Sequence, residues 1–144
     1  MSVPNPRREA FRILRQVEDA GAFASVLLET RSAELRDPRE VALLTEIVLG
    51  VLRRRAPLDH AIAKAAARPL EQIDGAVLTA IRIGAYALVY LDRIPDFAAV
   101  DTAVALVKEA GWAKAVGFAN GVLRKIARER SALLPPAPAT GDVE

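Results

Sequence analysis

The sequence of 144 residues contains no cysteine, and this absence removes several classes of protein at once. Without cysteine the chain has no disulfide scaffold, no cysteine-ligated zinc site and no catalytic thiol. A single histidine, His60, also excludes a site in which several histidines bind a metal. No serine lies near the Asp59-His60 pair in the sequence. We therefore expect neither a metal site nor a catalytic residue in this chain.

Long apolar runs are also missing. Before Pro135, no stretch of more than nine residues lacks a charged side chain, whereas a membrane-spanning helix needs about 20 apolar residues. The chain does not open on the apolar core of a signal peptide. These absences predict a cytoplasmic protein that does not insert into a membrane.

Aromatic residues are scarce, at 5% of the chain, although hydrophobic residues reach 52%. This hydrophobic content is sufficient for the core of one domain. Alanine and leucine supply most of it, and both favour helices, whereas sheets prefer β-branched and aromatic residues. The composition therefore predicts a single domain of the all-α class.

The spacing of apolar residues predicts a bundle of about seven helices. Asn5-Pro6 is typical of a helix start, and Gly21 is typical of a helix end. Residues 73–91 are apolar on nearly every face, which is typical of a central, buried helix. The last predicted helix covers residues 113–133.

A pair of glycines and a proline-rich segment near the end of the chain each lead to a prediction. Gly117 and Gly121 lie four residues apart within the last predicted helix, and this spacing suggests that another helix approaches closely there. The segment 135–144 is rich in proline and predicts a linker or a disordered tail. The helical domain is therefore expected to span residues 1–134.

Net charge alone does not identify a partner, because the formal value is only +2. Arginine accounts for 16 of the 20 basic residues, and its planar guanidinium group binds phosphate through two hydrogen bonds. This bias favours RNA. A genome that encodes arginine in place of lysine explains the same bias equally well. The positions of the basic residues in the sequence must therefore show whether RNA is a partner.

Three groups of basic residues are candidates for RNA contact, because clustered positive charge binds a phosphate backbone and releases counterions. Four fall within an arc of about 140° on the first helix, four share one side of the last helix, and one belongs to a run of three arginines. They are Arg7, Arg8, Arg12 and Arg15; Lys114, Arg124, Lys125 and Arg128; and Arg53. A solvated helix face and complementation of a helix dipole are the alternative explanations.

Three blocks of sequence resemble the NusB fold family. The blocks are Gly50-Val51-Leu52-Arg53 with Leu58-Asp59, Arg82-Ile83-Gly84-Ala85-Tyr86 with Leu91-Asp92-Arg93-Ile94-Pro95, and Gly117-Phe118-Ala119-Asn120-Gly121-Val122-Leu123-Arg124. They follow the order found in that family and cover most of residues 6–134. The resemblance implies a NusB-like helical bundle that binds RNA.

The family has two main branches. One is the free-standing transcription antitermination factor, which pairs with the ribosomal protein NusE and binds boxA RNA in ribosomal RNA leaders. The other is the N-terminal domain of 16S rRNA 5-methylcytosine methyltransferases of the RsmB, Sun or Fmu type. This chain is more similar to the second branch in Gly21-Ala22-Phe23-Ala24-Ser25, in Ala67-Arg68-Pro69-Leu70, in Leu91-Asp92-Arg93-Ile94-Pro95 and in its proline-containing ending.

Similarity to the second branch implies an RNA-binding domain that is not an enzyme by itself. The methyltransferase half of that branch binds S-adenosylmethionine and carries catalytic cysteines, so the cofactor is expected only in a catalytic domain missing from this chain. The expected partner is RNA, either 16S rRNA or its leader, and a monomer is expected rather than a homodimer. The alternatives are an antitermination factor that binds boxA RNA with NusE, and a protein-interaction module without an RNA role.

Overall fold

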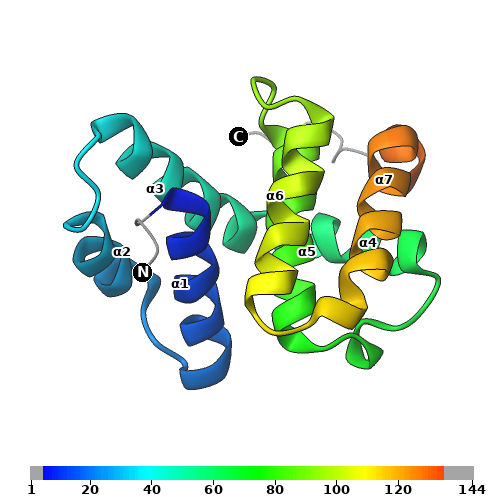
Figure 1. The fold of residues 1–144 in the computed structure, drawn as a ribbon, viewed down its shortest axis with the longest axis horizontal. Coiled ribbons are helices and arrows are strands. Elements are labelled where there is room, and N and C mark those ends of the chain that lie inside the picture. Colours follow the sequence, from blue (N-terminus) through cyan, green and yellow to red (C-terminus); the bar gives the residue numbers. More distant parts are fainter. Residues whose placement is uncertain (1–4, 135–144) are drawn as a thin grey trace, which may run out of the picture.

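The computed structural model describes residues 5–134, which form seven α-helices and two short 3-10 helices (Figure 1). In chain order these are α1 Pro6–Ala20, α2 Ala24–Ser32, α3 Pro38–Arg53, α4 Arg55–Ala66, η1 Leu70–Gln72, α5 Gly75–Tyr90, α6 Asp96–Glu109, η2 Ala113–Ala115 and α7 Val116–Leu133. The all-α class and the expected number of helices are thereby confirmed for this part of the chain. The segment 135–144 lies outside the described residues.

The helices form two groups that share α5. Figure 1 shows α1, α2 and α3 together on one side and α4, α6 and α7 on the other. Helices α1 and α3 pack against α5 from the first group, and α4, α6 and α7 pack against it from the second. Every residue of α5 from Val77 to Leu88 is buried, which confirms the central helix that the apolar run predicts. No helix within residues 5–134 is long and apolar enough to cross a membrane.

Local sequence signals set both ends of α1. The Asn5 side chain accepts a hydrogen bond of 2.9 Å from the backbone N–H of Arg8, and Pro6 occupies the first turn. Gly21 ends the helix with φ at 65°, in the left-handed region that glycine enters without strain. The expected start and end of this helix are therefore confirmed.

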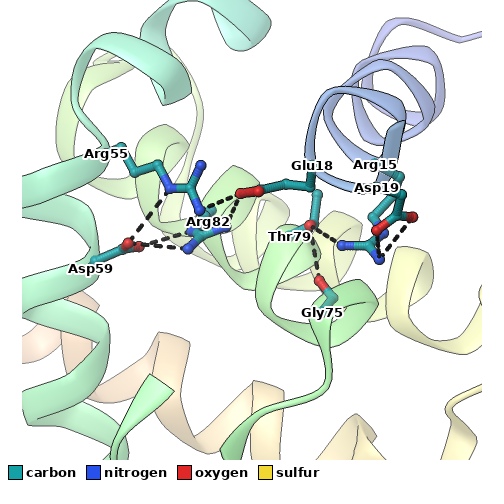
Figure 2. Close-up of polar contacts among 8 residues, drawn as sticks. All are labelled: Arg15, Glu18, Asp19, Arg55, Asp59, Gly75, Thr79 and Arg82. Carbon is teal, nitrogen blue, oxygen red and sulfur yellow. Dashed lines mark hydrogen bonds and ion pairs between the residues drawn. The ribbon is translucent and has the colours of Figure 1, made fainter. Parts of the chain in front are cut away.

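The two helix groups meet at a buried arginine of α5. Arg82 donates hydrogen bonds to both carboxylate oxygens of Asp59 on α4, at 2.8 and 3.0 Å, and lies 3.4 Å from Glu18 on α1 (Figure 2). Arg55, the first residue of α4, forms ion pairs with the same two carboxylates. This ion-pair network ties α1, α4 and α5 together. It gives Asp59, the sequence neighbour of His60, a structural role as the partner of Arg82 and Arg55.

The glycines that permit close helix packing are not the ones expected from spacing. A Cβ atom at Gly117 or Gly121 would meet no atom within 4 Å. The prediction that another helix approaches closely at these two positions is therefore wrong. A Cβ atom at Gly84, in contrast, would lie 2.7 Å from the Ala103 Cβ on α6 and 3.0 Å from the Leu123 side chain on α7. The contact of α5 with α6 and α7 therefore requires glycine at position 84.

Substitution of Gly84 with alanine is expected to destabilise the domain by about 1–3 kcal/mol, because the added methyl group overpacks the contact with α6. The matched control is Gly121→Ala, which adds the same group in open space and is expected to stabilise α7 by about 0.5–1 kcal/mol. Urea denaturation followed by far-UV circular dichroism gives both values. Equal stability of the Gly84 variant and the wild type would contradict this packing.

Candidate nucleic-acid interface

Two of the four arginines predicted to face RNA on α1 hold this helix against its neighbours. Arg8 Nε donates a hydrogen bond of 2.9 Å to the Glu109 carboxylate on α6, and this bond lowers the pKa of Glu109. Arg15 donates to the Thr79 hydroxyl on α5 at 3.2 Å and to the Asp19 carboxylate at 2.9 Å (Figure 2). Both guanidinium groups therefore have structural partners, and contact with RNA remains a prediction for them.

A third arginine of α1 neutralises a buried carboxylate. Glu9 is 0% exposed and accepts hydrogen bonds from Arg12 at 2.8 Å and from Arg31 of α2 at 3.3 Å. A buried carboxylate needs such partners, because an unpaired charge in the core costs several kcal/mol. Arg7 is the remaining member of the predicted arc, and it makes no side-chain hydrogen bond or ion pair within residues 5–134. Most of this basic arc therefore stabilises the fold.

Arg53 is exposed at the end of α3, apart from the other candidates. Its neighbours in the arginine run have different surroundings, since Arg54 lies 5.0 Å from the centre of the Tyr90 ring and Arg55 pairs with Glu18. The three side chains therefore point to different places, as consecutive helical positions predict. They do not form one contact surface.

Two arginines of α7 predicted to contact RNA lie on its outer face. Gly117, Gly121, Arg124 and Arg128 recur at spacings of four, three and four residues, which places them on one side of the helix, and all four are exposed. We call this row the α7 stripe. Its first half is bare backbone because glycine has no side chain, and its second half carries two guanidinium groups.

Two lysines extend the positive charge around the α7 stripe. Lys114 is exposed in η2, just before α7 begins, and Lys125 is half-buried beside the stripe. Neither lysine has a hydrogen-bond or ion-pair partner in the described part of the chain, and the same holds for Arg128. Arg124 donates only to the neutral side chain of Asn120, at 3.3 Å. Unlike Arg8, Arg12 and Arg15 of α1, these cations form no ion pair with a carboxylate within residues 5–134.

A groove of about 310 Å³ lies between α6 and α7, on one side of the stripe. Its walls include Arg124 and Arg128, but also Asp101 and Asp96. Asp96 is paired with Arg130 at 2.7 Å. The acidic residues make this groove less suitable for a phosphate chain than the stripe itself.

A second groove, of about 300 Å³, lies at the N-terminal end of α7. Arg68, Trp112, Lys114 and Phe118 line it, and we call it the Trp112 groove. The guanidinium carbon of Arg68 lies 4.5 Å from the centre of the Phe118 ring, in a cation–π contact. Only Lys114 among these residues is a contact predicted from the sequence. The signal that could have found Trp112 and Phe118 is their position on either side of Lys114, in a chain where aromatic residues are rare. No signal in the sequence places Arg68 beside them.

Within residues 5–134, no group of three or more histidine, aspartate or glutamate side chains is arranged to hold a metal ion. Buried polar side-chain atoms in this part of the chain all have hydrogen-bond partners. The polar groups that remain available for a ligand are therefore on the surface, above all around α7.

Known proteins similar to this chain belong to both kinds of NusB-like protein. The NusB family matches residues 4–128. A probable ribosomal RNA small subunit methyltransferase B from Bacillus subtilis (strain 168) is 34% identical over 131 residues, which are 90% of this chain and 29% of that protein. The transcription antitermination protein NusB from Methylococcus capsulatus is 32% identical over 105 residues, covering 72% of this chain and 53% of its relative.

A solved structure supports the same fold. A chain in the crystal structure of antitermination factors NusB and NusE in complex with dsRNA superposes with a TM-score of 0.76 at 25% identity, covering 85% of this chain and 93% of that chain. The present chain thus spans nearly all of that structure, but less than a third of the length of the Bacillus methyltransferase.

The structural role of Arg12 can be separated from RNA contact by its effect on stability. Arg12→Ala is expected to destabilise the domain by about 1–3 kcal/mol, because it removes a hydrogen bond from the buried Glu9 carboxylate. Arg128→Ala removes an arginine that has no carboxylate partner in the described residues and should change stability by no more than about 0.5 kcal/mol. Thermal and urea denaturation provide the measurement, and identical midpoints for the two variants would contradict the assignment.

Proposed function

The chain belongs to the NusB family, and from this premise we propose that it is the RNA-binding domain of a 16S rRNA 5-methylcytosine methyltransferase. Its similarity to methyltransferase B, of which it spans 29%, supports this branch of the family. The observation that carries the RNA-binding role is the α7 stripe with its two neighbouring lysines. These basic groups are exposed or half-buried, and no carboxylate in the described residues neutralises them.

The physical basis of this role is neutralisation of the RNA backbone. Between Lys114 and Arg128 the basic surface extends for about 20 Å along the helix axis. Gly117 and Gly121 leave space for a phosphate chain to approach the backbone of α7 closely, because no Cβ atom covers it. Each phosphate contact formed by Lys or Arg releases a bound counterion, so salt should weaken the complex strongly.

In this proposal the chain supplies recognition and no chemical step. Methyl transfer from S-adenosylmethionine belongs to the remainder of a longer protein, which the domain directs to its RNA. We assign this role to a monomer in the cytoplasm, with 16S rRNA or its leader as the RNA.

The second candidate is a transcription antitermination factor that binds boxA RNA together with NusE. The similarity to the NusB protein of Methylococcus capsulatus favours it, as does the superposition on a structure of NusB and NusE with RNA. It differs from the first candidate in needing a protein partner for tight binding.

The double variant Arg124→Gln/Arg128→Gln tests the α7 stripe. Its affinity for a 16S rRNA fragment should fall, and the slope of log affinity against log salt should decrease by about 0.7–0.9 for each phosphate that the variant no longer neutralises. Fluorescence anisotropy with labelled RNA at several salt concentrations measures both quantities.

The matched control for the stripe is Arg36→Gln/Arg39→Gln, which removes the same charge near the start of α3. Both arginines are exposed, and this variant should bind almost as tightly as the wild type. An equal loss of affinity in both double variants would mean that only the overall charge matters, and the stripe would then not be the contact surface.

The two candidate functions separate in an experiment with NusE. If the methyltransferase role is correct, addition of NusE should leave the affinity for boxA RNA within about twofold of its value for a scrambled RNA of equal length. A NusE-dependent gain for boxA of tenfold or more, about 1.4 kcal/mol, would favour the antitermination role instead.

A further inference from the structure

The Trp112 groove contains aromatic rings as well as cations, whereas the α7 stripe has no aromatic side chain. It brings together two cations and two aromatic rings from the segment after α4, from η2 and its preceding residue, and from the first turns of α7. Positive charge alone would suit any phosphate. Aromatic rings next to the cations add flat apolar faces, and such faces bind the bases of single-stranded nucleic acids by stacking.

The Trp112 side chain is partly exposed to solvent, and hydrogen bonds hold its backbone in place. It is the only tryptophan in the chain and is 42% exposed, so much of the indole lies outside the core. Its backbone N–H donates to the Val107 carbonyl at 3.1 Å, and its carbonyl accepts from the Ala115 N–H at 2.8 Å. These bonds fix the position from which the side chain projects. An exposed aromatic group in a fixed position is suited to receive a ligand with a flat surface.

The other aromatic ring of the groove already has a partner. Arg68 covers the Phe118 ring at 4.5 Å, and it forms no ion pair within residues 5–134. Its guanidinium group is therefore available to a phosphate or to the face of a base. Asp74 also lines the groove, but one of its carboxylate oxygens caps α5 by accepting a 2.8 Å hydrogen bond from Ala76 N–H. With Lys114 on the same wall, positive charge exceeds negative charge in the groove.

We propose that the Trp112 groove binds one unpaired nucleobase of the RNA, stacked on the Trp112 indole, while Arg68 and Lys114 neutralise the adjoining phosphate. This inference rests on the proposed RNA-binding function and adds the type of RNA that the domain recognises. Bases inside a duplex are already stacked and paired, so only a single-stranded segment can insert a base. The domain should therefore distinguish an unpaired strand from the same strand in a duplex.

The tryptophan itself reports on the site. A single-stranded oligonucleotide taken from 16S rRNA should quench the intrinsic tryptophan fluorescence as it binds. The duplex formed by the same oligonucleotide and its complement should bind, by anisotropy, with little quenching. Equal quenching by both forms at saturation would overturn the proposal.

Substitutions of Trp112 test the energetic contribution. Trp112→Ala should weaken single-strand binding about 5- to 150-fold, the range expected when one stacked base loses its platform. Trp112→Phe should recover most of this affinity, because an aromatic face remains, and affinity for the duplex should be unchanged in both variants. Phe23→Ala is the matched control, since it removes an aromatic ring that is 77% exposed at the start of α2.

Failure of this inference differs from failure of the proposed function. Salt-dependent binding of single-stranded RNA that is equally tight for wild type and Trp112→Ala would overturn the stacking site and leave the α7 stripe intact. Absence of binding to any RNA by the wild-type protein would overturn both. Far-UV circular dichroism of each variant confirms that the helices are retained.

Discussion

The arrangement of this domain depends on the ion-pair network around Arg82. This residue is the only charged one among the buried positions of α5, from Val77 to Leu88, and its guanidinium group has little access to solvent. A lone cation there would be strongly destabilising. The bidentate contact with Asp59 removes this cost only while α4 stays in place, because the fork of an arginine matches a carboxylate in one geometry. Glu18 imposes a similar requirement on α1.

The position of α4 in turn determines the surface around α7. Helix α7 packs on α4, α5 and α6, and its buried side includes Ala119, Leu123 and Ile126. The α7 stripe lies on the opposite side and remains outside the core. The chain that leaves α4 carries Arg68 to the Phe118 ring. A shift of α4 would thus alter both the packing of α7 and the Trp112 groove, although neither Arg82 nor Asp59 lies on that surface.

The helices were predictable because their signals are local. An asparagine followed by proline starts α1, and a segment that is apolar on nearly every face produces the central α5. The partners of the surface arginines were not predictable in the same way, since Arg8 meets Glu109 from a position 101 residues away. Helical spacing placed Arg8, Arg12 and Arg15 on a common face, but spacing contains no information about the carboxylates on neighbouring helices.

The glycines of α7 illustrate the same limit. Spacing of four residues is shared by glycines that face a packed helix and glycines that face solvent, and Gly117 and Gly121 are of the second kind. The close contact with α6 and α7 is at Gly84, which belongs to the apolar central helix, where one small residue among many gives no separate signal. Likewise Arg68 and Phe118 are 50 residues apart in the sequence and become neighbours only through the packing of α4 on α7.

The distribution of partners explains how a chain with a net charge of only +2 can still present a basic surface. Arg8, Arg12 and Arg15 on α1 and Arg82 on α5 pair with carboxylates of the domain, so they contribute little to the field outside. Phosphate would have to compete with those internal pairs. Lys114, Lys125 and the two arginines of the α7 stripe have no such competitor among the described residues. Counterions, or in the proposed function an RNA backbone that replaces them, can occupy their surface without disrupting the fold. Helix α7 also carries a structural arginine, since Arg130 pairs with Asp96 of α6, so arginines with and without carboxylate partners lie on the same helix.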